Sequence, residues 1–184
     1  MAYSIKRSCR RVAGAPYLPP PPVVDEAAWA DSSRELLFVE SPIKALAVAH
    51  HLKTAVIGLA GVSTGGETGE NRLHPELRQR VALDGRRVVI LFDSNRLKPQ
   101  VRKAEKTLAR QLHAVGASVF IAALPSIEGE DVGPDDFCRL LGANPLQKVV
   151  SEALPWRERL STDIPSWIDE LERTGERVYP LWGT

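Results

Sequence analysis

The stretch Arg87–Asn95 (RVVILFDSN) decides the fold of this chain. Its apolar residues run without interruption and stop at an acid, Asp93. An unbroken apolar run of this length is typical of a parallel strand that is buried on both faces. A second stretch, Leu36–Glu40 (LLFVE), has the same form and stops at Glu40. We therefore expect two buried strands, each of which delivers a carboxylate to the edge of a sheet.

The chain alternates between strand and helix patterns from residue 35 onward. Expected strands cover 36–39, 55–60, 87–92 and 118–124, and expected helices cover 42–52, 75–83, 98–116, 137–141 and 146–153. Such alternation predicts an α/β fold with a parallel sheet and right-handed crossovers. In the strand order 2-1-3-4, the ligand-binding crevice lies between the first and third strands, outside their carboxyl ends. Glu40 and Asp93 are then neighbours.

Length and composition favour one globular domain with extensions. The 184 residues carry a net charge of +1, which does not by itself indicate a nucleic-acid partner. Two cysteines in unrelated contexts argue against a disulfide framework, and no apolar run approaches the roughly 20 residues that span a bilayer. We expect a cytoplasmic protein without a membrane partner.

Three regions follow from the pattern. Residues 1–34 read as a basic N-terminal arm with a Pro-rich linker, 35–146 as the catalytic or metal-binding domain, and 147–184 as a C-terminal extension. The arm either contacts nucleic acid or a protein partner, or is a solvated tail. The extension is rich in tryptophan, which fits either packing against the domain or a partner interface.

The residues at the expected sheet edge suit a hard metal ion. Asp93, Asn95 and Glu40 all offer oxygen atoms, and Mg²⁺ or Mn²⁺ binds such ligands while it keeps waters that a phosphate can replace. A site of this kind supports phosphoryl transfer. Glu40 is either a second ligand or a general acid or base. Asp135, which follows the fourth strand, is either a third ligand or a cap of the next helix.

Basic residues cluster near the same edge. The helix from residue 98 and its entry carry six Lys or Arg residues against one acid, Glu105. This surface is either a phosphate-binding face or a solvated helix face. The glycine-rich loop 65–71 is not a Walker loop, because it lacks the Gly-Lys-Ser/Thr ending, and it is either a phosphate contact or a connection. The expected nucleic-acid contacts are Lys44, Arg72, Arg96, Lys98, Arg102, Lys103 and Lys106.

An ordered set of motifs resembles the Toprim domain of topoisomerases, bacterial-type primases and OLD-family nucleases. The set comprises 40–47 (ESPIKALA), the region of Gly61 and 89–95 (VILFDSN). Two further runs, 98–101 (KPQV) and 133–137 (GPDDF), are more similar still to a Toprim-like domain of unknown function in plasmid and phage replication proteins, often found beside primase or helicase modules. The resemblance covers roughly residues 35–142.

The resemblance implies a Toprim-like Rossmannoid fold with a four-stranded parallel sheet, flanking helices and a C-terminal helical extension. It implies that Glu40 is a general base in strand synthesis or a general acid in cleavage, and that Asp93 and Asn95 occupy an Asp-x-Asp metal motif. The expected activity is Mg²⁺- or Mn²⁺-dependent phosphoryl transfer on DNA or RNA, of a primase or nuclease type, in mobile DNA such as plasmids and phages. Primase or helicase components are expected partners, through the N-terminal arm or the Trp-rich extension.

Two departures from that family's pattern leave an alternative open. Ser41 stands where glycine is common, and Asn95 replaces the second aspartate and so removes a negative charge. The alternative is a catalytically degenerate module that binds nucleic acid or protein. A phospho-accepting receiver domain is disfavoured, because that class needs an acidic pair after the first strand and a lysine after a fifth strand, and neither is evident.

Overall fold

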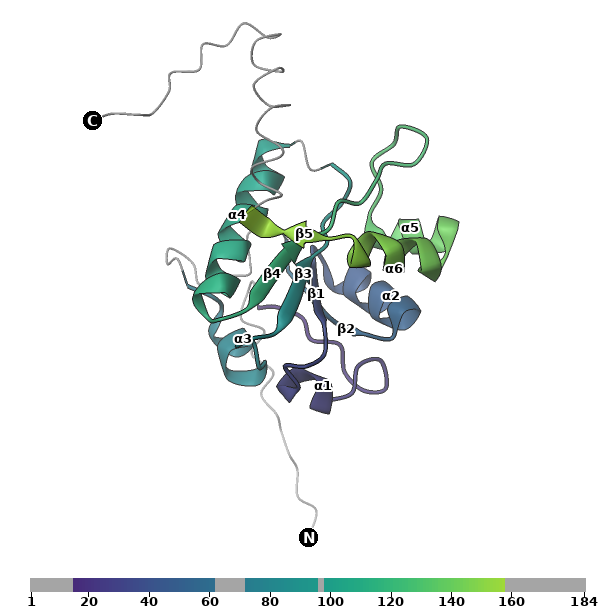
Figure 1. Cartoon of the computed structure of the whole chain (residues 1–184). Helices are drawn as coiled ribbons and strands as arrows, with labels where there is room; N and C mark the ends of the chain where they lie inside the picture. Colours follow the sequence, from purple (N-terminus) through teal and green to yellow (C-terminus); the bar gives the residue numbers. More distant parts are fainter. Residues whose placement is uncertain (1–14, 62–71, 96–97, 158–184) are drawn as a thin grey trace, which may run out of the picture.

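The computed structural model describes residues 15–61, 72–95 and 98–157, and its centre is a five-stranded sheet of order β2-β1-β3-β4-β5 (Figure 1). The first four strands, β1 (Leu36–Val39), β2 (Ala55–Gly58), β3 (Arg87–Ile90) and β4 (Ser118–Ile121), pair in parallel. The α/β class and the order 2-1-3-4 are confirmed. The count of four strands is wrong, because β5 (Leu154–Pro155) pairs antiparallel with β4. Two residues are too short to give a strand pattern in the sequence.

Helices cover both faces of the sheet. α3 (Pro75–Arg80) and α4 (Pro99–Ala114) lie on one face, and α2 (Pro42–Leu52), α5 (Pro134–Leu141) and α6 (Ala143–Ser151) lie on the other (Figure 1). All residues of β1 and β2 are consequently buried, as expected for parallel strands between two helical layers. Helix α4 packs on the sheet through an apolar face, since Val101, Ala104, Leu108 and Leu112 are all buried.

Helix α2 begins at Pro42, as the sequence predicts, and it packs on the sheet through small residues. Ser41 Oγ accepts the backbone N–H of Lys44 at 3.3 Å, and a proline occupies the first turn. Ile43 is 73% exposed, whereas the buried residues are Ala45, Val48 and Ala49. Small residues allow the helix to approach the sheet closely. At the contact stands Gly58, where an added Cβ would lie 2.7 Å from the Ser41 carbonyl oxygen.

The segment before β1 packs on the domain. Tyr17 exchanges two backbone hydrogen bonds with Gly58, of 2.7 and 2.9 Å, and Trp29 in α1 (Ala27–Ala30) is 2% exposed. The expectation of a solvated tail is therefore wrong for this part of residues 1–34. A proline-rich segment can pack in this way because aromatic and aliphatic residues interrupt it. The basic residues of the arm, at positions 6–11, lie outside the described residues.

The chain also packs on the domain from residue 147 to residue 157, in the first part of the expected C-terminal extension. Helix α6 crosses residue 147, and Val150 and Ala153 are buried against the core. Trp167 and Trp182 lie outside the described residues. No helix in the described ranges has both the length and the apolar character needed to cross a membrane.

Candidate functional site

Two carboxylates meet at the carboxyl edge of the sheet. Glu40 directly follows β1, and Asp93 follows the adjacent strand β3. The backbone N–H of Asp93 donates to Glu40 Oε1 at 3.4 Å. The structure thus brings together the two acids that the sequence placed at one crevice, although they are far apart in the chain.

Lys44 lies between these two acids. Its Nζ atom donates to Glu40 Oε2 at 3.4 Å and also contacts Asp93 Oδ1. The three side chains are 16–19% exposed. The sequence analysis assigned Lys44 to nucleic-acid contact and missed the ion pair, although the i,i+4 spacing from Glu40 was a usable signal. The contact with Asp93 has no local sequence signal.

The loop before α5 closes over this site. Ser94 N–H donates to the Val132 carbonyl at 3.0 Å, and Val132 N–H donates to Ser94 Oγ at 2.8 Å. These bonds place Gly133 against the acids. A Cβ atom on Gly133 would lie 2.5 Å from Asp135 Oδ1, 2.9 Å from Lys44 Cε and 3.1 Å from Asp93 Oδ1. Gly133 and Ser94 are positioning residues that the sequence analysis did not identify.

Asp135 and Asn95 each carry a buried oxygen without a hydrogen-bond partner. In the described part of the chain, these two Oδ1 atoms are the buried side-chain oxygen or nitrogen atoms that make no hydrogen bond. The prediction that Asp135 caps the helix is wrong, because α5 begins three residues earlier than expected, at Pro134, and its N-cap is Gly133. Unpartnered buried oxygens are costly, so they are expected to face water or a bound ion.

The electrostatics of the site couple the acids to the lysine. Burial raises the pKa of Glu40, and the neighbouring Asp93 charge raises it further, while Lys44 acts to lower it. Burial acts to lower the pKa of Lys44, but its hydrogen bond to Asp93 and the two carboxylate charges outweigh this effect, and the pKa is raised. The ammonium is therefore held in its charged form.

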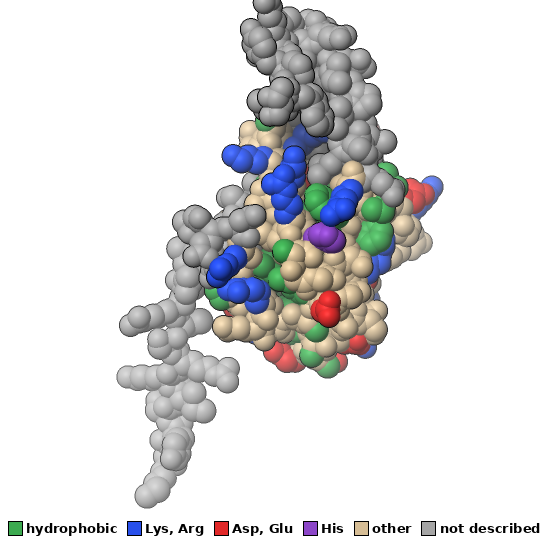
Figure 2. Space-filling view, turned by 60° about the vertical axis from the view of Figure 1, so that its left-hand side comes forward, with side chains coloured by type: hydrophobic (Ala, Val, Ile, Leu, Met, Phe, Trp, Pro, Cys, Tyr) green, Lys and Arg blue, Asp and Glu red, His purple; other side chains and the backbone are tan. Residues whose placement is uncertain are grey.

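Helix α4, on the sheet face opposite α2 and α5, presents a basic surface. Lys103, Lys106 and Arg110 are exposed, whereas Glu105, the one acid of the helix, is fully buried. Lys and Arg side chains are spread over the side of the molecule that carries α4, with few acidic side chains among them (Figure 2). The structure thus leaves the exposed face of α4 with positive charge only. Because of their 3, 4, 3 spacing, four residues form one line, which we call the α4 stripe: Lys103, Lys106, Arg110 and His113.

The other expected phosphate contacts differ in exposure and in pairing. Lys98 pairs with Asp131 at 3.4 Å, Arg102 is half-buried, and Arg72 is exposed. Arg96 and the glycine-rich loop 65–71 lie outside the described residues. Of the expected nucleic-acid contacts, Lys44 therefore lies at the two acids, and Lys103 and Lys106 lie on the exposed face of α4.

An aromatic and cationic cluster, missed by the sequence analysis, ends the α4 stripe. The His113 ring lies 5.9 Å from that of Trp156, and Arg157 Nη2 lies 3.4 Å from His113 Nε2. The Arg157 guanidinium also lies 5.4 Å from the Trp156 ring centroid. Basic residues that lead to an aromatic ring are typical of surfaces that bind single-stranded nucleic acid.

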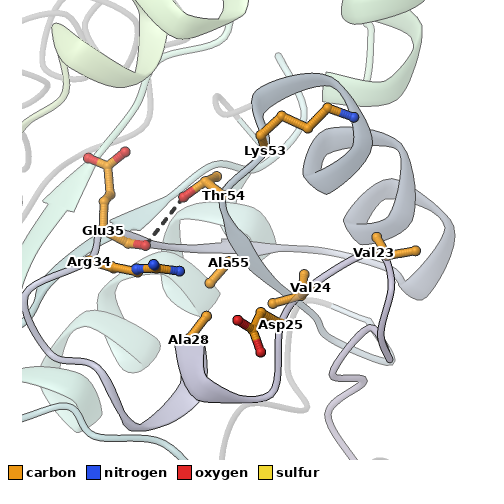
Figure 3. A pocket seen from close by; sticks show the side chains of 9 residues that line it. All are labelled: Val23, Val24, Asp25, Ala28, Arg34, Glu35, Lys53, Thr54 and Ala55. Atoms are coloured by element: carbon orange, nitrogen blue, oxygen red, sulfur yellow. Dashed lines mark hydrogen bonds between the residues drawn. The ribbon is translucent and has the colours of Figure 1, made fainter.

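A separate pocket of about 440 Å³ lies at the opposite end of the sheet. It is lined by Asp25, Arg34 and Thr54, among others, and Lys53 extends away from the other lining side chains (Figure 3). Neither of the unpartnered buried oxygens belongs to its lining. The features that indicate a ligand are concentrated at the carboxyl edge.

Comparison with known proteins identifies the family. A family profile described as "Domain of unknown function (DUF3854)" matches residues 27–144, which include Glu40, Lys44, Asp93 and Asp135 but not Trp156 and Arg157. The chain belongs to the DUF3854 family. No sequence among curated proteins matches it significantly.

Solved structures show the fold of this DUF3854 domain. It is similar to the zinc-binding and RNA polymerase domains of the Aquifex aeolicus primase, with 21% identity, a TM-score of 0.52 and 77% of this chain covered. It is also similar to a DNA primase domain from Pseudomonas aeruginosa, with 20% identity, a TM-score of 0.50 and 77% covered. The chain spans 31% and 44% of the lengths of those two structures. These similarities establish a primase-like fold.

Proposed function

We propose that this DUF3854 domain is Toprim-like and acts on nucleic-acid phosphates with a divalent cation, Mg²⁺ or Mn²⁺, in DNA replication or processing. The observation that carries the proposal is the meeting of Glu40 and Asp93 at the ends of two adjacent parallel strands. The primase-like fold and the basic α4 stripe support it. Plasmid or phage DNA and a primase or helicase partner belong to the same proposal.

The two carboxylates at this edge suit a hard divalent cation by their chemistry, although the described residues hold no group of three or more His, Cys, Asp or Glu side chains placed to bind an ion by themselves. Glu40 and Asp93 supply carboxylate oxygens, and Asn95 and Asp135 each add a buried oxygen that has no partner. Oxygen ligands of this kind suit Mg²⁺. An ammonium already lies between the two carboxylates, which shows that this position favours positive charge. When bound, the cation would neutralise phosphate charge.

The side chains of the domain would divide the remaining tasks. Glu40, whose pKa burial raises, is suited to accept or donate a proton at its carboxylate. Asp93 would orient the site through its carboxylate and through its N–H bond to Glu40. Lys103, Lys106 and Arg110 would hold the nucleic-acid backbone, and Trp156 would stack against an unpaired base.

One observation favours a second candidate function. Lys44 already neutralises part of the acidic charge, and Asn95 carries no charge of its own. A domain that binds nucleic acid through the α4 stripe without any turnover is consistent with this arrangement. Binding that persists without a divalent cation would then be expected.

The test compares wild type with Glu40→Gln and Asp93→Asn in primer-synthesis and nuclease assays. Single- and double-stranded DNA and RNA would be supplied with Mg²⁺ or Mn²⁺. We expect cation-dependent turnover that both substitutions abolish. The matched control is Asp136→Asn, because Asp136 lies in the same helical turn as Asp135 but is exposed and paired with Arg139.

Binding is measured separately by fluorescence anisotropy over a salt series. Replacing Lys103 and Lys106 by glutamine should weaken binding and flatten its salt dependence. Lys148→Gln, an exposed lysine on α6, should have little effect. Unchanged turnover in the Glu40 and Asp93 variants would contradict catalysis, and salt-dependent binding without turnover would select the binding module.

A further inference from the structure

The cation that the structure shows in the crevice is the side chain of Lys44. This residue is in the first turn of α2, and its backbone N–H donates to the side chain of the Ser41 cap, so its backbone position is fixed. Its Nζ atom bridges Glu40 and Asp93, the two carboxylates that would hold a divalent cation. The ammonium therefore lies where two negative charges favour a cation.

The Gly133 side of this site is closely packed. The Gly133 backbone stands where even one added carbon would lie 2.9 Å from Lys44 Cε and 3.1 Å from Asp93 Oδ1. The Ser94–Val132 hydrogen bonds hold this loop in place. Space for a cation and its waters beside the ammonium is therefore lacking on this side.

We propose that Lys44 and a divalent cation are alternative occupants of the crevice, so that Lys44 must leave before the cation binds. This inference rests on the metal site proposed above. The lysine side chain has four flexible carbons and is anchored at the mouth of the crevice, so it can turn to solvent while α2 stays in place. Cation binding and the release of Lys44 are then one linked event.

Two measurements follow from this linkage. Removal of the ammonium should strengthen cation binding, because the competing charge is lost. Addition of the cation should expose the Lys44 amine to chemical modification, because the amine no longer bonds to Glu40 and Asp93. Neither measurement depends on catalytic activity.

The first experiment titrates Mn²⁺ into the full chain and follows free Mn²⁺ by electron paramagnetic resonance. We expect Lys44→Met and Lys44→Gln to bind Mn²⁺ about tenfold more tightly than wild type, since a unit charge is removed from a half-buried site. Lys98→Met is the matched control. Lys98 pairs with an exposed acid at 3.4 Å, and its loss should change the affinity less than about twofold.

The second experiment labels amines with acetic anhydride and measures each lysine by peptide mass spectrometry. We expect saturating Mg²⁺ to raise Lys44 labelling several-fold and to leave Lys98 labelling unchanged. The use of two Lys44 variants and an unmutated labelling sample keeps the test valid if one variant folds poorly.

The outcomes separate this inference from the proposed function. If wild type binds Mn²⁺, Asp93→Asn abolishes binding and the Lys44 variants bind no more tightly, competition by Lys44 is refuted and the metal site stands. If neither wild type nor the Lys44 variants bind Mn²⁺, the inference and the proposed metal site both fall. Tighter binding together with increased Lys44 labelling supports the inference.

Discussion

Two cations, the buried Arg86 and the half-buried Lys44, lie at opposite edges of the sheet and have opposite surroundings. Arg86, directly before β3, is fully buried and donates only to backbone carbonyls among its described hydrogen bonds. Burial lowers its pKa. Lys44 contacts two carboxylates instead, and its pKa is raised. Arg86 therefore has a structural role, because it donates to neutral backbone carbonyls. Lys44 contacts two carboxylates, which can bind another cation in its place.

The largest expected effect comes from Arg86. Arg86→Met would remove the guanidinium donors from the carbonyls of Ala28, Trp29, Arg34 and Ala82, of which that of Trp29 keeps the backbone N–H of Ala82. We expect the free energy of unfolding to fall by about 3–5 kcal/mol, measured by urea titration with circular dichroism. Arg80→Met is the control, because Arg80 makes exposed ion pairs and its loss should cost less than about 1 kcal/mol. Equal losses in both variants would show that Arg86 has no special structural role.

The second prediction compares alanine substitutions of two glycines, Gly58 between α2 and the sheet and Gly133 at the site. Gly58→Ala would place a Cβ atom 2.7–2.8 Å from backbone atoms of Ser41 and Pro42, which cannot move without shifting α2. We expect a loss of about 2–3 kcal/mol in unfolding free energy. Gly133→Ala meets side-chain atoms and should cost only about 1 kcal/mol, but should weaken Mn²⁺ binding more than Gly58→Ala does. Unaltered Mn²⁺ binding in Gly133→Ala would remove Gly133 from the site.

The third prediction concerns how the stabilisation by Lys44 depends on pH. Its raised pKa means that the folded state holds the proton more tightly than the unfolded state does, so the stabilisation is complete below the ordinary value of 10.5 and is lost as the pH rises through the higher folded value. We expect Lys44→Met to be about 2 kcal/mol less stable than wild type at pH 7–9. Urea titrations should show this difference shrinking above pH 10.5. A difference that stays constant up to pH 12 would mean that the methionine changes packing alone.

The smallest expected effect is the change with pH in the stability of Glu40→Gln relative to wild type. Its pKa is raised chiefly by burial, so its favourable contribution is complete below the ordinary value of 4.5 and is lost as the pH rises through the folded value. Glu40→Gln does not titrate, so its stability relative to wild type should improve by less than about 1 kcal/mol between pH 4 and pH 8. Asp136→Asn provides the comparison for an exposed carboxylate. A relative stability of Glu40→Gln that falls with pH would reverse the inferred effect of burial.

Much of the fold was readable from the sequence because buried parallel strands have a strong signal. The runs that end at Glu40 and Asp93 located β1 and β3, and the Ser41-Pro42 pair located the start of α2. The buried face of α2 is hard to predict from hydrophobicity, because the close approach of that helix to Gly58 favours small residues and leaves Ile43 exposed. The two-residue strand β5 was too short to predict.

The site was only partly predictable, because some of its residues have a local sequence signal and others do not. Strand ends identify Glu40 and Asp93, since an acid that stops an apolar run stands out. In the sequence, Arg86 is one of two adjacent arginines, and nothing near it shows that Arg86 is the buried one. Gly133 is an ordinary loop glycine until the fold brings it against Lys44 and Asp93.

The sequence by itself determined where the strands stop, how α2 begins and which acids reach the carboxyl edge, because these features depend on neighbouring residues. The tertiary structure alone decided which cation lies between the acids and how closely Gly133 covers it. The contact of Lys44 with Asp93 joins residues 49 positions apart. Such a contact depends on the pairing of β1 with β3 and on the loop before α5, which local sequence patterns do not encode.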